Sequence, residues 1–172
     1  VGAVPTLYTG LTSMFLHGGW LHLLGNLWFL WVFGNNVEDS MGHGRFLVFY
    51  LLCGLVAAAA QVAVDPASAV PMVGASGAIS GVMGAYVFLY PRVRVRVIIF
   101  LGIIFFRTGL PAWVMLGYWF LLQLGGAAVA PAEGGGVAFW AHAGGFIAGL
   151  VLILLFRDPE LIARRNRRYM FV

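Results

Sequence analysis

Residues 73–90 read VGASGAISGVMGAYVFLY. This uncharged stretch is long enough to cross the hydrocarbon core of a bilayer as a helix, which takes roughly 17–25 mainly apolar residues. It also carries two serines, Ser76 and Ser80. Polar groups at membrane depth are costly and mark functional sites by default. The stretch therefore predicts a membrane-spanning helix that holds part of a site.

The composition of the whole chain also indicates a membrane protein. Of its 172 residues 62% are hydrophobic and only 9% are charged, with a mean hydropathy of +0.94. Soluble domains carry about 25% charged residues, so this chain cannot cover a water-facing surface. Its length suits one domain. The single cysteine, Cys53, excludes an internal disulfide framework, and we expect it to be a buried small hydrophobe.

Other apolar runs flank the first one. Three have suitable length and lie at residues 46–64, 110–130 and 137–156. A fifth run, 19–34, is slightly short and contains His22 and Asn26, but its Trp and Phe content favours a span with polar residues in it. The run 97–106 is too short to cross, so we expect an interfacial or re-entrant segment that returns to the side it left. The predicted fold is an all-α membrane bundle with five spanning helices.

The positive charges predict the orientation of the bundle. The chain has ten arginines and no lysine, and they fall within residues 35–45, 92–107 and 157–172. With five crossings these stretches share one side, and the opposite loops contain no arginine. The positive-inside rule then places the N-terminal loop outside and the C-terminus in the cytoplasm. Topology accounts for the net charge of +4, so we expect no nucleic-acid partner.

These features divide the chain into two parts. Residues 1–156 are expected to form the membrane core, and residues 157–172 a basic cytoplasmic tail, either a short surface helix or a disordered end. The chain opens without a basic n-region, so we expect no signal peptide and a true N-terminus upstream. A bacterial plasma membrane is the default location.

Polar side chains gather in the outer halves of three predicted spans. Ser76 lies about one turn into its span and His142 between one and two turns into 137–156. At about 1.5 Å per residue, the two lie at comparable depth. Stripes of small residues let helix backbones approach closely in lipid, and both helices have such a stripe, comprising Gly77, Gly81, Gly145 and Gly149. A contact between Ser76 and His142 is therefore geometrically reasonable.

This pair indicates nucleophilic catalysis. A serine hydroxyl becomes an effective nucleophile when a neighbouring base, usually neutral histidine, takes its proton. Every carboxylate of the chain lies in a loop or at a span end, so we expect a dyad rather than a triad. The imidazole must then be oriented by packing or by another hydrogen bond. The Ser76 backbone N–H and the side chains of His22 and Asn26 are candidate oxyanion donors.

Less specific interpretations exist for each residue. Serine within a span is usually a packing or helix-bonding residue, and we expect Ser80 to be only that. A single histidine is more often structural. His17, His22 and His142 could bind a metal, but Asn26 is a poor zinc ligand and no HExxH motif is present. We therefore expect no metal site.

Three motifs together resemble the rhomboid intramembrane serine proteases. They are GASG around Ser76, AHAGGFIAG around His142 and HGGWLHLLGN, which supplies His17, His22 and Asn26. They occur in the family's order, and the likeness extends over residues 6–156. It implies a six-helix core with a water-filled cavity open to the outer side, single-span membrane proteins as substrates and no cofactor.

The resemblance also implies a role for each residue. Ser76 would attack the peptide bond, and His142 would act as general base and then as general acid. His22 and Asn26 would line the oxyanion pocket, to which we also assign His17 and Gly74. The family's first core helix and the Trp-Arg pair of its outer loop have no counterpart here, so we expect a fragment. Some members have an aromatic residue at the position of Ser80 that packs on the histidine.

Two other functions remain as alternatives. One is a non-catalytic rhomboid-like protein that binds membrane clients, although such a protein need keep neither Ser76 nor His142. The other is a small-solute transporter or channel, which the missing intramembrane carboxylates and the absence of a second pseudo-symmetric half disfavour.

Overall fold

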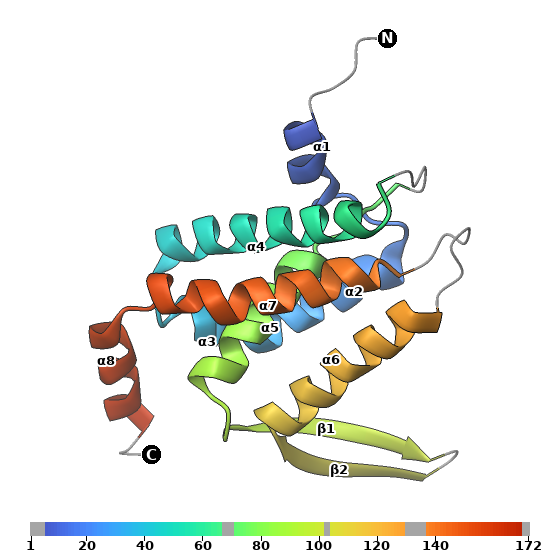
Figure 1. Ribbon diagram of the computed structural model, residues 1–172. Helices are drawn as coiled ribbons and strands as arrows, with labels where there is room; N and C mark the ends of the chain where they lie inside the picture. Colours follow the sequence, from blue (N-terminus) through green and yellow to red (C-terminus); the bar gives the residue numbers. More distant parts are fainter. Residues whose placement is uncertain (1–5, 67–70, 102–103, 130–136, 170–172) are drawn as a thin grey trace.

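The computed structural model describes residues 6–66, 71–101, 104–129 and 137–169. Parts of the predicted outer loops, 67–70 and 130–136, lie outside these residues. The described chain is mostly helical, with one β-hairpin (Figure 1). Its elements are α1 (Thr6–Ser13), α2 (Trp20–Phe29), η1 (Leu30–Gly34), α3 (Asn35–Glu38), α4 (His43–Val64), α5 (Ser76–Leu89), β1 (Arg94–Leu101), β2 (Ile104–Pro111), α6 (Ala112–Val129), α7 (Phe139–Phe156) and α8 (Pro159–Tyr169).

The five predicted spans are all helical. Among the described residues, α4, α6 and α7 are each long and apolar enough to cross a membrane. The predicted run 19–34 corresponds to α2 and the π-helical η1, which continue without a break into α3. The helical fold class is therefore confirmed, and the correspondence between predicted runs and helices is close.

Helix α5 is shorter than its predicted span. Its 14 residues rise about 21 Å, less than the roughly 30 Å hydrocarbon core of a bilayer. The cause is Gly74, whose φ of 118° is a conformation that side chains rarely adopt, so residues 73–75 are not helical. Ser76 is consequently the first residue of α5, and the prediction that it lies one turn inside the helix was wrong.

Helix α5 occupies the centre of the bundle and touches α7 at the backbone. Every residue from Gly77 to Tyr86 is buried. A Cβ atom at Gly145 would overlap the carbonyl oxygen of Gly77, and one at Gly149 would overlap that of Gly81. The predicted glycine stripes thus lie where the two helices meet. On the other side of α5, Cys53 of α4 is fully buried, with its Sγ 2.5 Å from where a Cβ of Gly81 would stand.

Two hydrogen bonds fix the direction of α4 against α7, which lie side by side in Figure 1. Near one end, the Ala141 N–H donates to Gln61 Oε1 at 3.2 Å. Near the other end, the Arg45 guanidinium donates to the Leu155 carbonyl oxygen at 3.2 Å. The two helices are therefore antiparallel, whereas α5 and α7 run in the same direction and begin at the same end.

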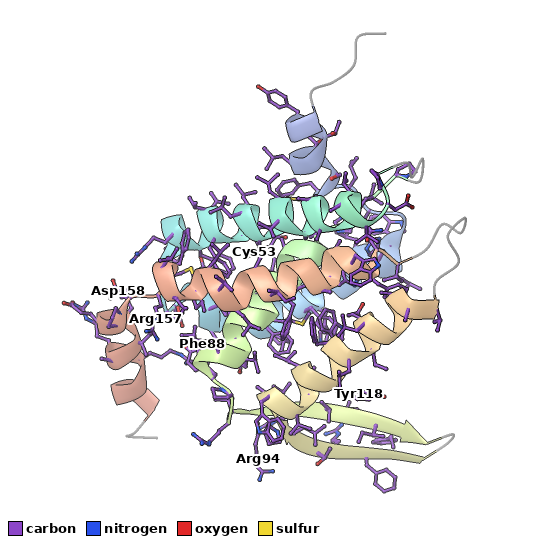
Figure 2. The ribbon with its side chains drawn as sticks, viewed as in Figure 1. Cys53, Phe88, Arg94, Tyr118, Arg157 and Asp158 are labelled. Atoms are coloured by element: carbon purple, nitrogen blue, oxygen red, sulfur yellow. The ribbon has the colours of Figure 1, made fainter. Side chains whose placement is uncertain are left out.

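Contacts made by α8 and by the two residues before it hold together the end of the bundle that carries most of the described arginines. The Asp158 N–H donates to the Ser40 carbonyl at 2.7 Å, and Arg157 lies 5.5 Å over the ring of Phe88 (Figure 2). Arg165 lies 4.1 Å over the ring of Tyr90. This end is opposite the one where α5 and α7 begin. The structure thus separates these arginines from Ser76, and which end is cytoplasmic stays a prediction.

The segment between α5 and α6 forms an antiparallel hairpin rather than a helical or irregular segment. Strands β1 and β2 pair from Arg94 opposite Pro111 to Leu101 opposite Ile104. The start of β1, RVRV, alternates polar and β-branched residues, which is the period of a strand. The described residues of the expected run, 97–101 and 104–106, thus form the distal part of the hairpin, and the strands are an addition to the predicted all-α fold.

The α5–α7 contact predicts a strong effect of added volume. Gly149→Ala should lower the free energy of unfolding by about 1–3 kcal/mol or more. The added methyl group would meet the backbone of Gly81, which cannot move aside as a flexible side chain could. Gly117→Ala on α6 is the matched control, since nothing lies within 4 Å of a Cβ there. The measurement is reversible unfolding in detergent. Equal stability of the two variants would contradict the close contact.

Candidate active site

The GASG turn places Ser76 at the N-terminus of α5. Gly74 reverses the chain at its positive φ, and its N–H donates to the Ser13 carbonyl at 2.9 Å. As the first residue of α5, Ser76 has a backbone N–H that belongs to the first helical turn, where no intrahelical acceptor is available. The positive end of the helix dipole also favours negative charge there. The hydroxyl is therefore placed beside groups that can stabilise an anion.

His142 contacts Ser76 directly. It is the fourth residue of α7, and its Nε2 lies 2.7 Å from Ser76 Oγ, within hydrogen-bond range. Helices α5 and α7 are parallel and touch at Gly77 and Gly145, which follow Ser76 and His142 by one and three residues, so the two side chains lie beside this contact. The structure thus brings together the two residues that the sequence paired by depth.

The other side of the imidazole is bound by α6. Gln123 Oε1 lies 2.7 Å from His142 Nδ1, and the ring of Trp119 lies 5.9 Å from the imidazole, tilted by 37°. These two residues take the place expected of an aromatic residue at position 80. Sequence patterns did not single them out, although Gln123 is a strongly polar side chain within a predicted span, the same signal that marked Ser76.

His22 and Asn26 of α2 complete a cavity of about 260 Å³. Asn26 is buried, and its Nδ2 has no hydrogen-bond partner among the described residues. A buried donor without a partner costs free energy, which a ligand oxygen could recover. The cavity is lined by Leu21, His22, Gly25, Asn26, Phe29, Ser76, Ile79, Ser80, Met83, Trp119 and His142.

The remaining predicted pocket residues support His22. Its Nδ1 accepts a hydrogen bond from the Gly18 N–H at 3.4 Å, which leaves Nε2 to carry the ring proton. A Cβ at Gly74 would stand 2.8 Å from that Nε2, so only glycine leaves room for the ring. His17 packs edge-on against His22 at 5.2 Å between centroids and is not one of the residues that line the cavity.

Ser80 takes a different role from Ser76. Its hydroxyl donates to the Ser76 carbonyl oxygen at 2.6 Å, one helical turn back. This is the helix-bonding arrangement expected of a serine within a span. Its hydroxyl proton is therefore already used, although the side chain borders the cavity.

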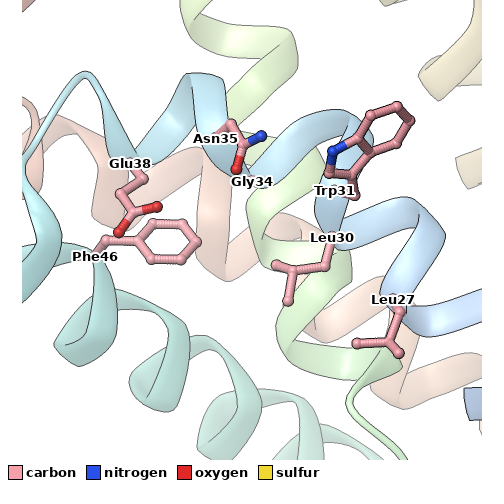
Figure 3. Close-up of a pocket in the computed structure, with 7 residues that line it drawn as sticks. All are labelled: Leu27, Leu30, Trp31, Gly34, Asn35, Glu38 and Phe46. Atoms are coloured by element: carbon pink, nitrogen blue, oxygen red, sulfur yellow. The ribbon is translucent and has the colours of Figure 1, made fainter.

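A second pocket lies between the continuous helical segment formed by α2, η1 and α3 and the start of α4 (Figure 3). It has a volume of about 300 Å³ and contains no serine or histidine; its lining is Leu27, Leu30, Trp31, Gly34, Asn35, Glu38 and Phe46. Among the described residues, no group of three or more His, Cys, Asp or Glu side chains gathers in a way that could hold a metal ion. The chemistry of the described residues is therefore concentrated at Ser76 and His142.

Comparisons with known proteins find several rhomboid relatives of this chain. Rhomboid protease GluP of Bacillus subtilis is 42% identical over 79 residues, which are 46% of this chain and 15% of that protein. Rhomboid-like protein 11, chloroplastic, of Arabidopsis thaliana is 42% identical over 77 residues, 45% of this chain and 27% of that protein. Presenilin-associated rhomboid-like protein, mitochondrial, of Bos taurus is 32% identical over 101 residues, 58% and 26% of the two chains.

The matched segments thus span well under two thirds of these relatives. A model of the whole family covers much more of this chain. The family described as the Rhomboid domain matches residues 5–159, which include every helix from α1 to α7 and both strands. With its apolar helices, the chain is a multi-pass membrane protein that belongs to the rhomboid family.

Proposed function

We propose that the chain is an intramembrane serine endopeptidase that cleaves the membrane-spanning segments of other proteins. The observation that carries the proposal is the 2.7 Å contact between Ser76 Oγ and His142 Nε2 beside a cavity with an unpartnered amide donor, Asn26. Family membership adds to it, since GluP is named a protease. The relatives' names also include proteins called only rhomboid-like, so activity rests on the geometry.

The first half of the reaction forms an acyl-enzyme. His142 Nε2 takes the hydroxyl proton as Ser76 Oγ attacks the carbonyl carbon of the scissile peptide bond, giving a tetrahedral oxyanion. His142 then donates that proton to the leaving amide nitrogen, the C–N bond breaks, and the amine product departs. The substrate acyl group remains as an ester on Ser76.

The second half restores the enzyme. A water molecule loses a proton to His142 Nε2 as it attacks the ester carbonyl, and a second tetrahedral oxyanion forms. Collapse of this intermediate expels the Ser76 oxygen, which regains the proton from His142. The carboxylic acid product leaves, and the Ser76–His142 hydrogen bond is re-formed.

Both oxyanions need donors that are already in place. The Ser76 N–H points from the first turn of α5, Asn26 Nδ2 is buried without a partner among the described residues, and His22 carries its proton on Nε2. These donors need no reorganisation when the negative charge develops, which is why preorganised donors lower the barrier. Asn26 is the strongest candidate donor of the three, because its buried Nδ2 has no other hydrogen-bond partner among the described residues.

The cavity favours an apolar, extended substrate segment. Leu21, Ile79, Met83 and Trp119 surround the polar groups, so a peptide from a membrane span would find apolar walls and one polar end. Single-span membrane proteins are the proposed substrates. From the charge pattern we also propose that this end of the bundle is outside and the C-terminus in the cytoplasm, with a bacterial plasma membrane as the default location.

The nucleophile is tested with a fluorophosphonate probe and a single-span reporter. Wild-type protein should label and cleave, Ser76→Ala should do neither, and His142→Ala should lose about 10²- to 10⁴-fold in rate. Ser40→Ala is the control, because this buried hydroxyl bonds Val37 at the opposite end and should leave labelling intact. Labelling that survives Ser76→Ala would refute the assignment; a wild type that binds the reporter without labelling would favour client binding.

The oxyanion role of Asn26 is tested by separating turnover from binding. Asn26→Ala should lower kcat by about 10²- to 10³-fold, the effect of removing one oxyanion donor, while reporter affinity changes little. Asn35→Ala, an exposed amide of α3, provides the control. Equal losses of turnover and affinity in the Asn26 variant would indicate a structural role instead.

A further inference from the structure

We infer that Gln123 is the positioning residue of this site, holding His142 in the one neutral tautomer that can accept the proton of Ser76. The inference rests on the proposed function and adds a residue to it. It starts from the fact that both ring nitrogens of His142 are bound, Nε2 by Ser76 Oγ and Nδ1 by Gln123 Oε1, each at 2.7 Å.

The chemistry of an amide oxygen decides the tautomer. Gln123 Oε1 can only accept, so Nδ1 must carry the proton of the neutral ring. Nε2 then has a free lone pair directed at the Ser76 hydroxyl, which is the state a general base needs. When Nε2 gains the proton during the reaction, Nδ1–H still donates to Gln123, and the ring cannot turn away from Ser76.

A neutral amide suits this position better than a carboxylate. The contact lies between apolar helices, where a lone carboxylate would pay a large desolvation penalty. An amide supplies the same acceptor geometry without a charge. It therefore orients His142 at low cost, and the imidazolium formed during the reaction has no negative partner on this side.

The neighbours of Gln123 on α6 hold it against α7. Phe120 stacks on Phe146 at 4.8 Å, and the ring of Phe139 fills the space beside Gly126. Together with Trp119, these residues recur at the spacing of one helix face. The buried residues of α6 are Ala112 and Leu116, both near its other end. At the site end, α6 is therefore fixed by this face, and Gln123 is its polar contact.

The test compares two substitutions in the full chain. Gln123→Leu keeps the volume but removes the acceptor, and kcat should fall about 10- to 100-fold with KM within about twofold. Gln123→Glu keeps an acceptor and should restore most of the rate at high pH. Its carboxylate stabilises the imidazolium, so the acidic limb of the kcat/KM profile should move to higher pH.

Gln61→Leu is the matched control. Gln61 is also a glutamine within a span, and it bonds the Ala141 N–H next to His142 rather than the imidazole. If the inference holds, Gln61→Leu should leave the pH profile unchanged, whatever it does to stability. A Gln123→Leu protein with wild-type kcat and pH profile, or a Gln61→Leu protein with the same profile change as Gln123→Glu, would overturn the inference.

A measurement that needs no activity separates this inference from the proposed function. In the wild-type protein with ¹⁵N-labelled histidine, His142 should show a protonated Nδ1 and an unprotonated Nε2, and Gln123→Leu should redistribute the proton. A proton on Nε2 in the wild type would mean that the amide donates to the ring, and the inference would be wrong. A wild type that neither labels nor cleaves would refute the proposed function, and the tautomer would still decide the role of Gln123.

Discussion

The backbone contact between α5 and α7 is the constraint on which the site depends. At Gly77–Gly145 and Gly81–Gly149 no side chain separates the two helices. In lipid, helices associate through such close packing and its dispersion energy rather than through the hydrophobic effect. Since the two helices run parallel and in contact just beyond Ser76 and His142, Ser76 reaches His142 at 2.7 Å. A single methyl group in this contact would separate nucleophile and base.

The membrane also selects the chemistry of the site. The polar side chains around Ser76 are two imidazoles, two amides and a hydroxyl, all of which can be neutral: His142, His22, Gln123, Asn26 and Ser80. A triad carboxylate would have to be desolvated between apolar helices. Short hydrogen bonds between neutral groups cost less there. Both ring nitrogens of His142 and the Ser76 hydroxyl already make such bonds. The dyad is thus what a low-dielectric scaffold favours, with an amide in the place of the acid.

Much of this could be predicted from the sequence, because hydropathy and polar residues at membrane depth are local signals. They located the five apolar helical runs and the pair Ser76 and His142. Among the described residues, three of these helices are long and apolar enough to cross a membrane. The start of α5 was misplaced because hydropathy does not register the positive φ of Gly74. The hairpin was missed because a short apolar run fits several structures, and its strand alternation begins outside that run. Gln123 could not be assigned, because its partner depends on which face of α6 meets α7.

The helices around the site depend on one another for their positions. In the proposed mechanism, α5 and α7 supply the nucleophile and the base, α2 supplies oxyanion donors, and α6 supplies the bond that orients the base. The buried residues of α6, Ala112 and Leu116, lie towards its other end, so the half of α6 next to the site is held largely by the groups that touch His142 and its neighbours. The orientation of His142 therefore depends on the position of α6, and the position of α6 depends on His142. A dyad without a carboxylate can keep its geometry in this way, because α6 supplies the orienting contact that a buried carboxylate would otherwise provide.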